Sequence, residues 1–202
     1  MFYETSKNDH GLPYNPFKAI VAPRPIGWIT SMSAKGEVNL APYSFFNGIT
    51  DKPPIVMFSS EGFKDSVAFV EKTKEFVCSL ATFDLREQMN GTSAPLPRGQ
   101  SEMLHAGLEA APSRLVKPPR VAASPCALEC KWLKTVGFDV DGRKLDRYAV
   151  FGHVVGVYID DRFINNGRLD TAAMRPIARC GYDEYAVIEA MFKMTRPPGG
   201  GA

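Results

Sequence analysis

The chain has 202 residues, which is enough for one well-packed core and short for two. Its 24 Lys and Arg residues oppose 22 Asp and Glu, with no dense basic stretch, so we expect no nucleic-acid binding. No apolar run reaches the roughly 18 residues of a membrane helix. The N-terminus also lacks the pattern of a signal peptide. We therefore expect a cytoplasmic protein without membrane contact.

The composition favours a β-rich fold with many turns, because 13 Phe and seven Tyr accompany 17 Gly and 16 Pro. We predict a single domain over residues 1–194. The remaining residues, 195–202, include two prolines followed by three glycines. Such a segment buries too little apolar surface to fold, so we predict a disordered tail.

The first half of the chain predicts strands separated by turns and two helices. Apolar, β-branched runs predict strands over residues 25–32, 38–40, 54–59 and 76–81. A turn at residues 33–36 joins the first two. Asp65 or Ser66 can cap a helix that runs to about Lys72. A second helix is predicted over residues 84–90, where Gly91 ends it.

The second half begins with an irregular stretch, residues 91–125, which contains six prolines. A long irregular insertion in a compact domain is usually functional or mobile, so this one either covers a ligand site or forms a subunit contact. Strands are then predicted over residues 127–138, 148–159 and 184–189, and a short helix over 171–175. The Asp141-Gly142 pair between the first two of these strands predicts a hairpin. The pattern as a whole predicts a mainly β protein, an antiparallel barrel with peripheral helices.

Two of the four cysteines, Cys126 and Cys130, lie in one predicted strand. Four residues of strand span roughly 13 Å, whereas a disulfide needs Cα atoms within about 7 Å. Zinc needs two further ligands, and no Cys or His pair of suitable spacing occurs elsewhere. We predict buried thiols and no metal site.

Small polar residues gather where the predicted strands of the first half end. Hydroxyls, a lysine and free amides at a helix N-terminus suit a phosphate monoester, and Lys64, Asp65 and Ser66 open such a helix. Asn and Ser beside aromatic residues suit a flat, hydrogen-bonding heterocycle, as in residues 39–47. Each feature also has a simpler explanation: a turn, a solvated lysine or an ordinary helix cap.

The order of three motifs is more specific than any one of them. They are APRPIGWITS at residues 22–31, NLAPYSFFN at residues 39–47 and KDS at residues 64–66. In this order they resemble the flavin reductase-like, FMN-binding split-barrel family, and most of all its flavoredoxin-like branch. Weaker matches follow at residues 151–155, 159–161 and 176–181. The resemblance implies an FMN-binding split β-barrel, which is an antiparallel Greek-key barrel.

The resemblance also implies a homodimer that holds FMN non-covalently near the subunit interface. It implies cofactor-binding roles as follows: Thr30 and Ser31 near the ribityl phosphate end; Asn39, Ala41, Pro42, Ser44, Phe45, Phe46 and Asn47 along the isoalloxazine; Ser59, Lys64 and Ser66 around the phosphate; and Asp65 steadying the turn. Many relatives have Thr where this chain has Ser66, a change that keeps the hydroxyl.

Three further residues carry open alternatives. Arg24 either contacts the phosphate or braces its loop. Arg179 contacts the ligand or the partner subunit. His153, in the middle of a predicted strand, is either a partly buried structural histidine or a catalytic residue that assists the nicotinamide donor, as in some relatives.

The resemblance predicts an oxidoreductase, most simply an NAD(P)H-dependent flavin reductase that transfers hydride from NADH or NADPH to flavin. Because flavin carries the redox chemistry, the absence of a Ser-His-Asp set or a carboxylate pair agrees with this hypothesis. The first alternative is a flavoredoxin-type electron carrier, which holds FMN tightly and exchanges electrons with a partner protein. The second is a binding module without turnover.

Overall fold

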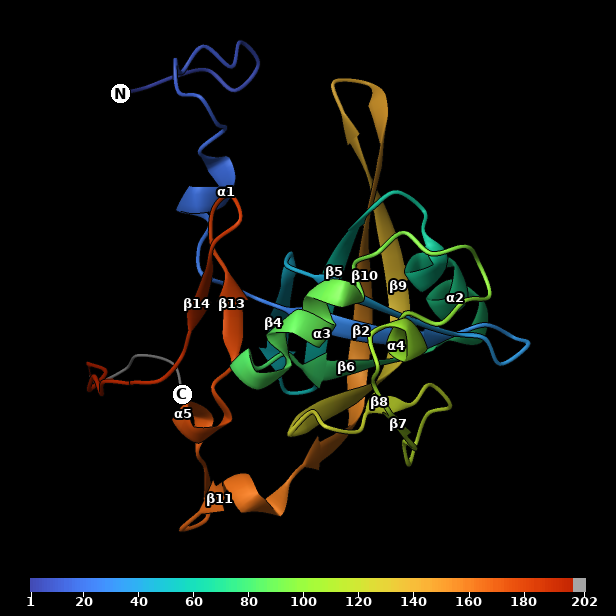
Figure 1. The fold of residues 1–202 in the computed structure, drawn as a ribbon. Helices are drawn as coiled ribbons and strands as arrows, with labels where there is room; N and C mark the ends of the chain where they lie inside the picture. The colour runs from blue at the N-terminus through green and yellow to red at the C-terminus, as the bar shows by residue number, and fades with distance from the viewer. Residues whose placement is uncertain (198–202) are drawn as a thin grey trace.

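Seven antiparallel strands form the body of the protein in the computed structural model, which describes residues 1–197 (Figure 1). In chain order they are β2 (Gly27–Met32), β3 (Val38–Tyr43), β4 (Phe46–Asp51), β5 (Pro54–Glu61), β6 (Glu75–Leu80), β9 (Cys126–Val140) and β10 (Arg143–Ile159). Their order across the sheet is β3-β2-β6-β9-β10-β5-β4. Four of them match predicted strands to within two residues, and β10 begins five residues before its prediction. β3 runs three residues beyond its prediction, and β4 was not predicted.

The sheet curls so that its two edges approach each other. Tyr43, at the end of β3, lies with its ring centroid 4.8 Å from that of Phe58 on β5. The connection between β3 and β4 completes the approach, because Ser59 donates its backbone N–H to the carbonyl of Phe45 at 2.8 Å. The prediction of a mainly β, antiparallel barrel is therefore confirmed.

A smaller antiparallel sheet stands beside the barrel, formed by β1 (Arg24–Pro25), β13 (Ile177–Arg179) and β14 (Tyr185–Val187). The prediction of one strand over residues 25–32 was wrong at its start, since β1 pairs with β13 whereas β2 pairs with β3 and β6. Pro25 has no N–H to continue a ladder, which explains the break. Two minor hairpins complete the strands: β7 (Ala110–Ala111) with β8 (Arg120–Val121), and β11 (Ile164–Asn165) with β12 (Arg168–Leu169).

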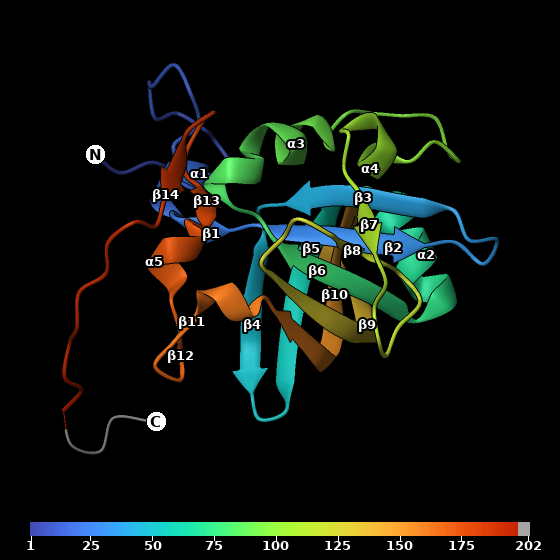
Figure 2. The same cartoon turned by 60° about the horizontal axis from the view of Figure 1, so that its bottom comes forward.

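The helices lie around the barrel, and α3 and α4 pass over β3 (Figure 2). They are α1 (Phe17–Ile20), α2 (Asp65–Thr73), α3 (Arg86–Gly91), α4 (Glu102–His105) and α5 (Thr171–Met174), with 3₁₀ turns at Phe83–Leu85 and Asp161–Phe163. The predicted helix over 84–90 is thus a 3₁₀ turn followed by α3. None of these helices, all within residues 1–197, has the length and apolarity needed to cross a membrane.

Two main clusters of buried side chains pack against opposite faces of β2, because successive residues of a strand point to opposite sides. Ile29 packs with Phe58 and Val70, and Trp28 packs with Leu40 and Val121. The proline-rich stretch over 91–125 contributes to the second cluster through Met103, Leu108 and Val121. That stretch is therefore built into the core rather than loosely attached. Of the predicted tail at 195–202, residues 198–202 lie outside the described residues, and residues 195–197 have no regular structure.

The hairpin of β9 and β10 rises above the rest of the sheet (Figure 1). Its turn contains Asp141 with φ 52° and Gly142 with φ 71°, the left-handed conformations that a two-residue hairpin turn requires. The hairpin predicted from Asp141-Gly142 is confirmed. Both strands extend further toward the turn than predicted, to Val140 and from Arg143.

Gly152 on β10 provides a test of packing in the first cluster. A Cβ atom on Gly152 would lie 2.3 Å from the ring of Phe76. We expect Gly152→Ala to lower the free energy of unfolding by about 1–3 kcal/mol, measured by urea titration. Gly137→Ala is the control, because a Cβ at Gly137 on the neighbouring β9 meets nothing within 4 Å. Equal losses in both variants would contradict the packing argument.

Candidate functional site

A polar cavity of about 420 Å³ lies between β3, the start of α2 and the chain after α3. Six of the residues predicted to bind the cofactor line it: Asn39, Ala41, Pro42, Lys64, Asp65 and Ser66. The structure therefore brings two motifs that are 17 or more residues apart, at 39–47 and 64–66, to one place. Residues 92–96 form the opposite wall.

The N-terminus of α2 opens toward this cavity without a side-chain cap within the described chain. The prediction that Asp65 or Ser66 caps the helix was wrong: the N-cap position is Lys64, and Asp65 is the first helical residue. The Asp65 carboxylate instead accepts hydrogen bonds from Arg98. Because the first N–H groups of a helix have no intrahelical acceptor, α2 presents free donors and partial positive charge at this wall.

Three small polar side chains support this end of the cavity. Asn39 donates from Nδ2 to Ser66 Oγ at 2.8 Å and to Ser31 Oγ at 3.4 Å. All three are buried, so they hold one arrangement and are not exposed to solvent. Ser31 thus lies behind the cavity wall and acts on it through Asn39.

Acidic groups also border the cavity, and each has a partner. Asp65 is paired with Arg98, and Glu102 accepts the backbone N–H of Leu40 at 3.1 Å. Burial raises the pKa of Tyr43, which outweighs the opposing effect of its hydrogen bonds to Ser66 and Ser60. Tyr43 therefore stays neutral near pH 7 and remains a hydrogen-bond donor at the cavity wall.

A second, smaller cavity of about 260 Å³ adjoins the first, since Pro42 and Ser93 line both. We call it the cationic cavity, because its charged lining residues are Lys18, Arg24 and Arg179. Ser44 lines it as well. Arg24, Ser44 and Arg179, which were also predicted to bind the cofactor, therefore line the cationic cavity and not the polar cavity.

Arg24 braces the chain around this second cavity, which was one of its two predicted roles. Its Nη1 donates to the carbonyls of Lys18 and Val21, and its Nη2 donates to the carbonyl of Cys180 at 2.7 Å. The guanidinium also lies 5.5 Å from the ring centroid of Phe45. These bonds tie α1 and the chain after β13 to β1.

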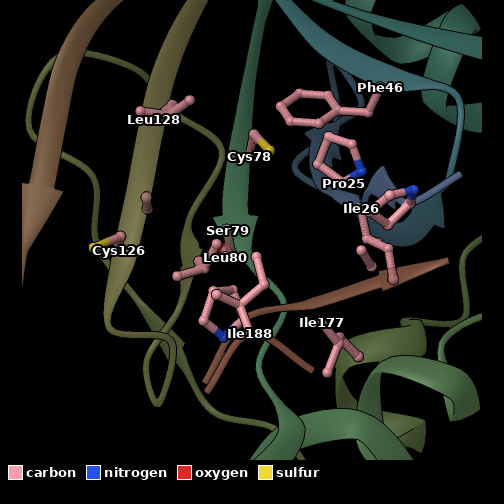
Figure 3. Close-up of a pocket in the computed structure, with 14 residues that line it drawn as sticks. Pro25, Ile26, Phe46, Cys78, Ser79, Leu80, Cys126, Leu128, Ile177 and Ile188 are labelled. Carbon is pink, nitrogen blue, oxygen red and sulfur yellow. The ribbon is translucent and has the colours of Figure 1, made fainter. Parts of the chain in front are cut away.

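An apolar cavity of about 290 Å³ opens on the other side of Ile26, between the barrel and the small sheet (Figure 3). Phe46 and Cys78 line it together with Pro25 and Leu128. Burial raises the pKa of the Cys78 thiol to about 12 and also raises that of Cys126, the second cysteine of this lining, so neither favours the thiolate near neutral pH.

The burial of the thiols predicts their reactivity. Cys78 and Cys130 are buried, whereas Cys126 and Cys180 are half-buried. Burial raises the pKa values of Cys78, Cys130 and also Cys126. At pH 8 we expect a disulfide reagent such as DTNB to label Cys180 first in the native protein and Cys126 more slowly, because its pKa is raised. The other two should react only after unfolding. Cys180→Ser should remove part of the rapid reaction; a similar loss in Cys78→Ser would contradict the assignment.

The remaining predicted residues are not brought into these cavities within residues 1–197. They are Thr30, Phe45, Asn47, Ser59 and His153. Thr30 is fully buried, and its Oγ1 has no partner among the described residues. Asn47 is exposed on β4 and accepts the N–H of Gly48. His153 lies on β10 opposite Ile55 and Lys131, so its proposed catalytic role stays a prediction.

Sequence reasoning missed several lining residues. The irregular stretch over 91–125 contributes Ser93 and Glu102 to the lining, and it also carries Arg98, which bonds to Asp65. No periodicity in this stretch indicated which side chains face inward. The alternative that this stretch covers a ligand site agrees with its position, since residues 92–96 line the polar cavity. Among residues 1–197, no group of three or more His, Cys, Asp or Glu side chains is placed to hold a metal ion.

Residues 21–171 match the sequence model of the family described as flavin reductase like domain. The chain belongs to this flavin reductase-like family. The matched range contains the whole polar cavity and ends before β13. The family predicted from the motifs is therefore confirmed.

Relatives of this flavin reductase-like protein agree with its fold. It is 32% identical to an uncharacterized protein of Aquifex aeolicus (strain VF5), with 92% of this chain and 94% of the relative covered. Nitrilotriacetate monooxygenase component B from Bacillus cereus has a TM-score of 0.89 at 24% identity, covering 96% of this chain and 98% of its own. The 2-nitrobenzoate 2-nitroreductase of Pseudomonas fluorescens has a TM-score of 0.85 at 26% identity, covering 100% and 99%. The predicted split-barrel fold is confirmed.

Proposed function

We propose that this protein is an FMN-dependent oxidoreductase that takes hydride from NADH or NADPH. The observation that carries the proposal is the polar cavity at the open N-terminus of α2, where Lys64 and Ser66 stand beside free backbone donors. A helix N-terminus with a lysine and a hydroxyl is well suited to a phosphate monoester. The volume of the polar cavity, about 420 Å³, is also within the range of ligand pockets.

The residues of the cavity fit the phosphate end of FMN. Lys64 supplies charge, Ser66 supplies a hydroxyl that Asn39 holds in place, and Asp65 is neutralised by Arg98. The isoalloxazine would then extend along residues 41–47, which pass from the polar cavity to the cationic and apolar cavities. FMN would supply the hydride-accepting chemistry, and the chain's part is to bind and orient it.

We further propose a cytoplasmic homodimer. Three apolar side chains after β14 are largely exposed in the single chain: Met191 at 62%, Phe192 at 85% and Met194 at 81%. The segment that carries them extends away from the barrel (Figure 2). Apolar surface of this kind favours association with a second copy. Sedimentation velocity of the purified protein tests the proposal, and a monomer at micromolar concentration would refute it.

One observation favours the alternative of a flavoredoxin-type electron carrier. Residues 92–96 cover the polar cavity, and Arg98 ties the same stretch to α2 through Asp65. When an ion pair holds the segment that covers a site, release of the bound ligand is slower. This arrangement therefore favours a flavin that stays bound over one that leaves as product. In that case the protein would exchange electrons with a partner protein and would not oxidise nicotinamide.

Two measurements separate these functions. The absorption spectrum of the freshly purified protein shows whether flavin is bound, and NADH and NADPH are then added with free FMN under air. Steady nicotinamide oxidation is expected for the oxidoreductase. Bound flavin without nicotinamide oxidation would support the electron carrier. Failure to bind or process any flavin would refute both and leave a binding module.

A further inference from the structure

The cationic cavity contains positive charge that nothing in the described chain neutralises. Lys18, Arg24 and Arg179 line it, and no Asp or Glu among residues 1–197 does. None of the three forms an ion pair with a carboxylate of the described residues, whereas Arg98, Arg147, Arg162 and Arg175 all do. Unpaired cations gathered around one cavity give it a positive potential that attracts an anion.

Arg24 makes this imbalance costly, because its side chain is only 6% exposed. Backbone carbonyls accept from both its terminal nitrogens, yet carbonyl dipoles do not cancel a full charge. Its buried Nε has no partner among the described residues. A buried donor of this kind is normally satisfied, so Arg24 retains an unmatched hydrogen-bonding group as well as an unmatched charge beside the cavity.

The lining also fixes the shape of a ligand. Tyr182 and Tyr185 stand beside the cations, and Arg179 lies 4.5 Å from the ring centroid of Tyr185 while donating to the carbonyl of Tyr182. Flat phenol and guanidinium faces favour a planar ligand. With about 260 Å³ the cavity accommodates a single ring and its anionic group, but not a dinucleotide.

We propose that the cationic cavity is a binding site for a planar aromatic carboxylate, separate from the phosphate site at α2. Its carboxylate would accept from Arg179 and Lys18, and its ring would lie against Tyr182 or Tyr185. Lys18, Arg179, Tyr182 and Tyr185 all lie outside residues 21–171, the part that matches the family model.

The position of the site gives it a role in the proposed oxidoreductase, and that part of the inference rests on the proposed function. Pro42 and Ser93 separate the cationic cavity from the polar cavity, and Ser44 faces the cationic side. A carboxylate held here lies beside residues 41–47, along which the flavin is proposed to extend. The bound acid would then lie next to the flavin, with its carboxylate held by the cations of the cavity.

The test uses benzoate and benzamide, which share a ring and differ in charge, with binding measured by calorimetry on the full chain before flavin is added. Benzoate is expected to bind at least about tenfold more tightly than benzamide, since charge-assisted hydrogen bonds contribute about 1.5–3 kcal/mol. Arg179→Gln should remove that preference. Arg175→Gln is the matched control, because Arg175 pairs with Asp84 and Glu189.

Two results would overturn the inference: equal binding of benzoate and benzamide, or unchanged benzoate binding in Arg179→Gln. A titration with FMN then separates this site from the flavin site. FMN binding that leaves benzoate affinity within about twofold supports two sites, whereas strict competition would assign the cavity to the flavin and overturn the proposal. Benzoate binding without any FMN binding would refute the proposed function and leave this site standing.

Discussion

Replacing Lys64 with alanine is expected to weaken the binding of FMN by about 10- to 150-fold and to leave riboflavin binding within about twofold. Lys64 holds the N-cap position of α2 and lines the polar cavity, where the phosphate is proposed to bind. A charge-assisted hydrogen bond of about 1.5–3 kcal/mol gives that range. Riboflavin has no phosphate, so it does not report on this interaction. Fluorescence titration with both flavins measures the two affinities.

The control for this experiment is Lys72→Ala, which removes an exposed lysine from the last turn of the same helix. It should bind both flavins like the parent protein. Ser66→Ala is expected to weaken FMN further when combined with Lys64→Ala. Ser66→Ala also removes the hydrogen-bond acceptor of Asn39. The melting temperature of each variant that carries it must therefore be measured as well. Equal losses for FMN and riboflavin in Lys64→Ala would show that the phosphate is bound elsewhere.

Replacing Trp28 with alanine is expected to lower the free energy of unfolding by about 3–5 kcal/mol, the largest effect of any single substitution considered. Trp28 is fully buried in the second core cluster, between β2 and the stretch that covers the polar cavity. Its Nε1 donates at 2.9 Å to Oγ1 of Thr92, the first of the residues 92–96 that line the cavity. Urea unfolding followed by circular dichroism measures the loss.

Trp28→Phe separates packing from hydrogen bonding, because it keeps most of the ring and removes the donor. We expect it to cost about 1 kcal/mol. Trp132→Ala is the matched control: its indole is only half-buried, and its Nε1 donates to Thr135 at 3.0 Å within the same strand. If Trp132→Ala lost as much stability as Trp28→Ala, burial of Trp28 would not be the decisive factor.

Local patterns were sufficient to predict most of the barrel. The strand over residues 54–59 and the Asp141-Gly142 turn carry their own signals, an apolar run and a residue pair that favours left-handed backbone. β4 was missed because Phe46–Asp51 contains Asn, Gly and Asp, and its strand geometry comes from pairing with β5. α4 was missed because it is one short turn whose stability comes from burying Met103.

The candidate site was predictable where it follows contiguous motifs. Lys64, Asp65 and Ser66 were identified by position and resemblance, and they do meet Asn39 and Ala41 at one cavity. The separation of Arg24 and Arg179 from that cavity was not predictable, because it depends on the pairing of β1 with β13 across more than 150 residues of chain. Likewise, no local pattern indicates that Arg98 pairs with Asp65.

The hairpin of β9 and β10 also bears on how the chain reaches its fold. These strands lie at the centre of the large sheet, yet a turn at Asp141-Gly142 joins them, so they can pair before any distant contact forms. β5 and β6 can then add to a preformed template on either side. A residue with a side chain strains the positive φ of Gly142 by about 1–2 kcal/mol. We therefore expect Gly142→Val to slow refolding while unfolding changes little; a change confined to the unfolding rate would place this pairing late.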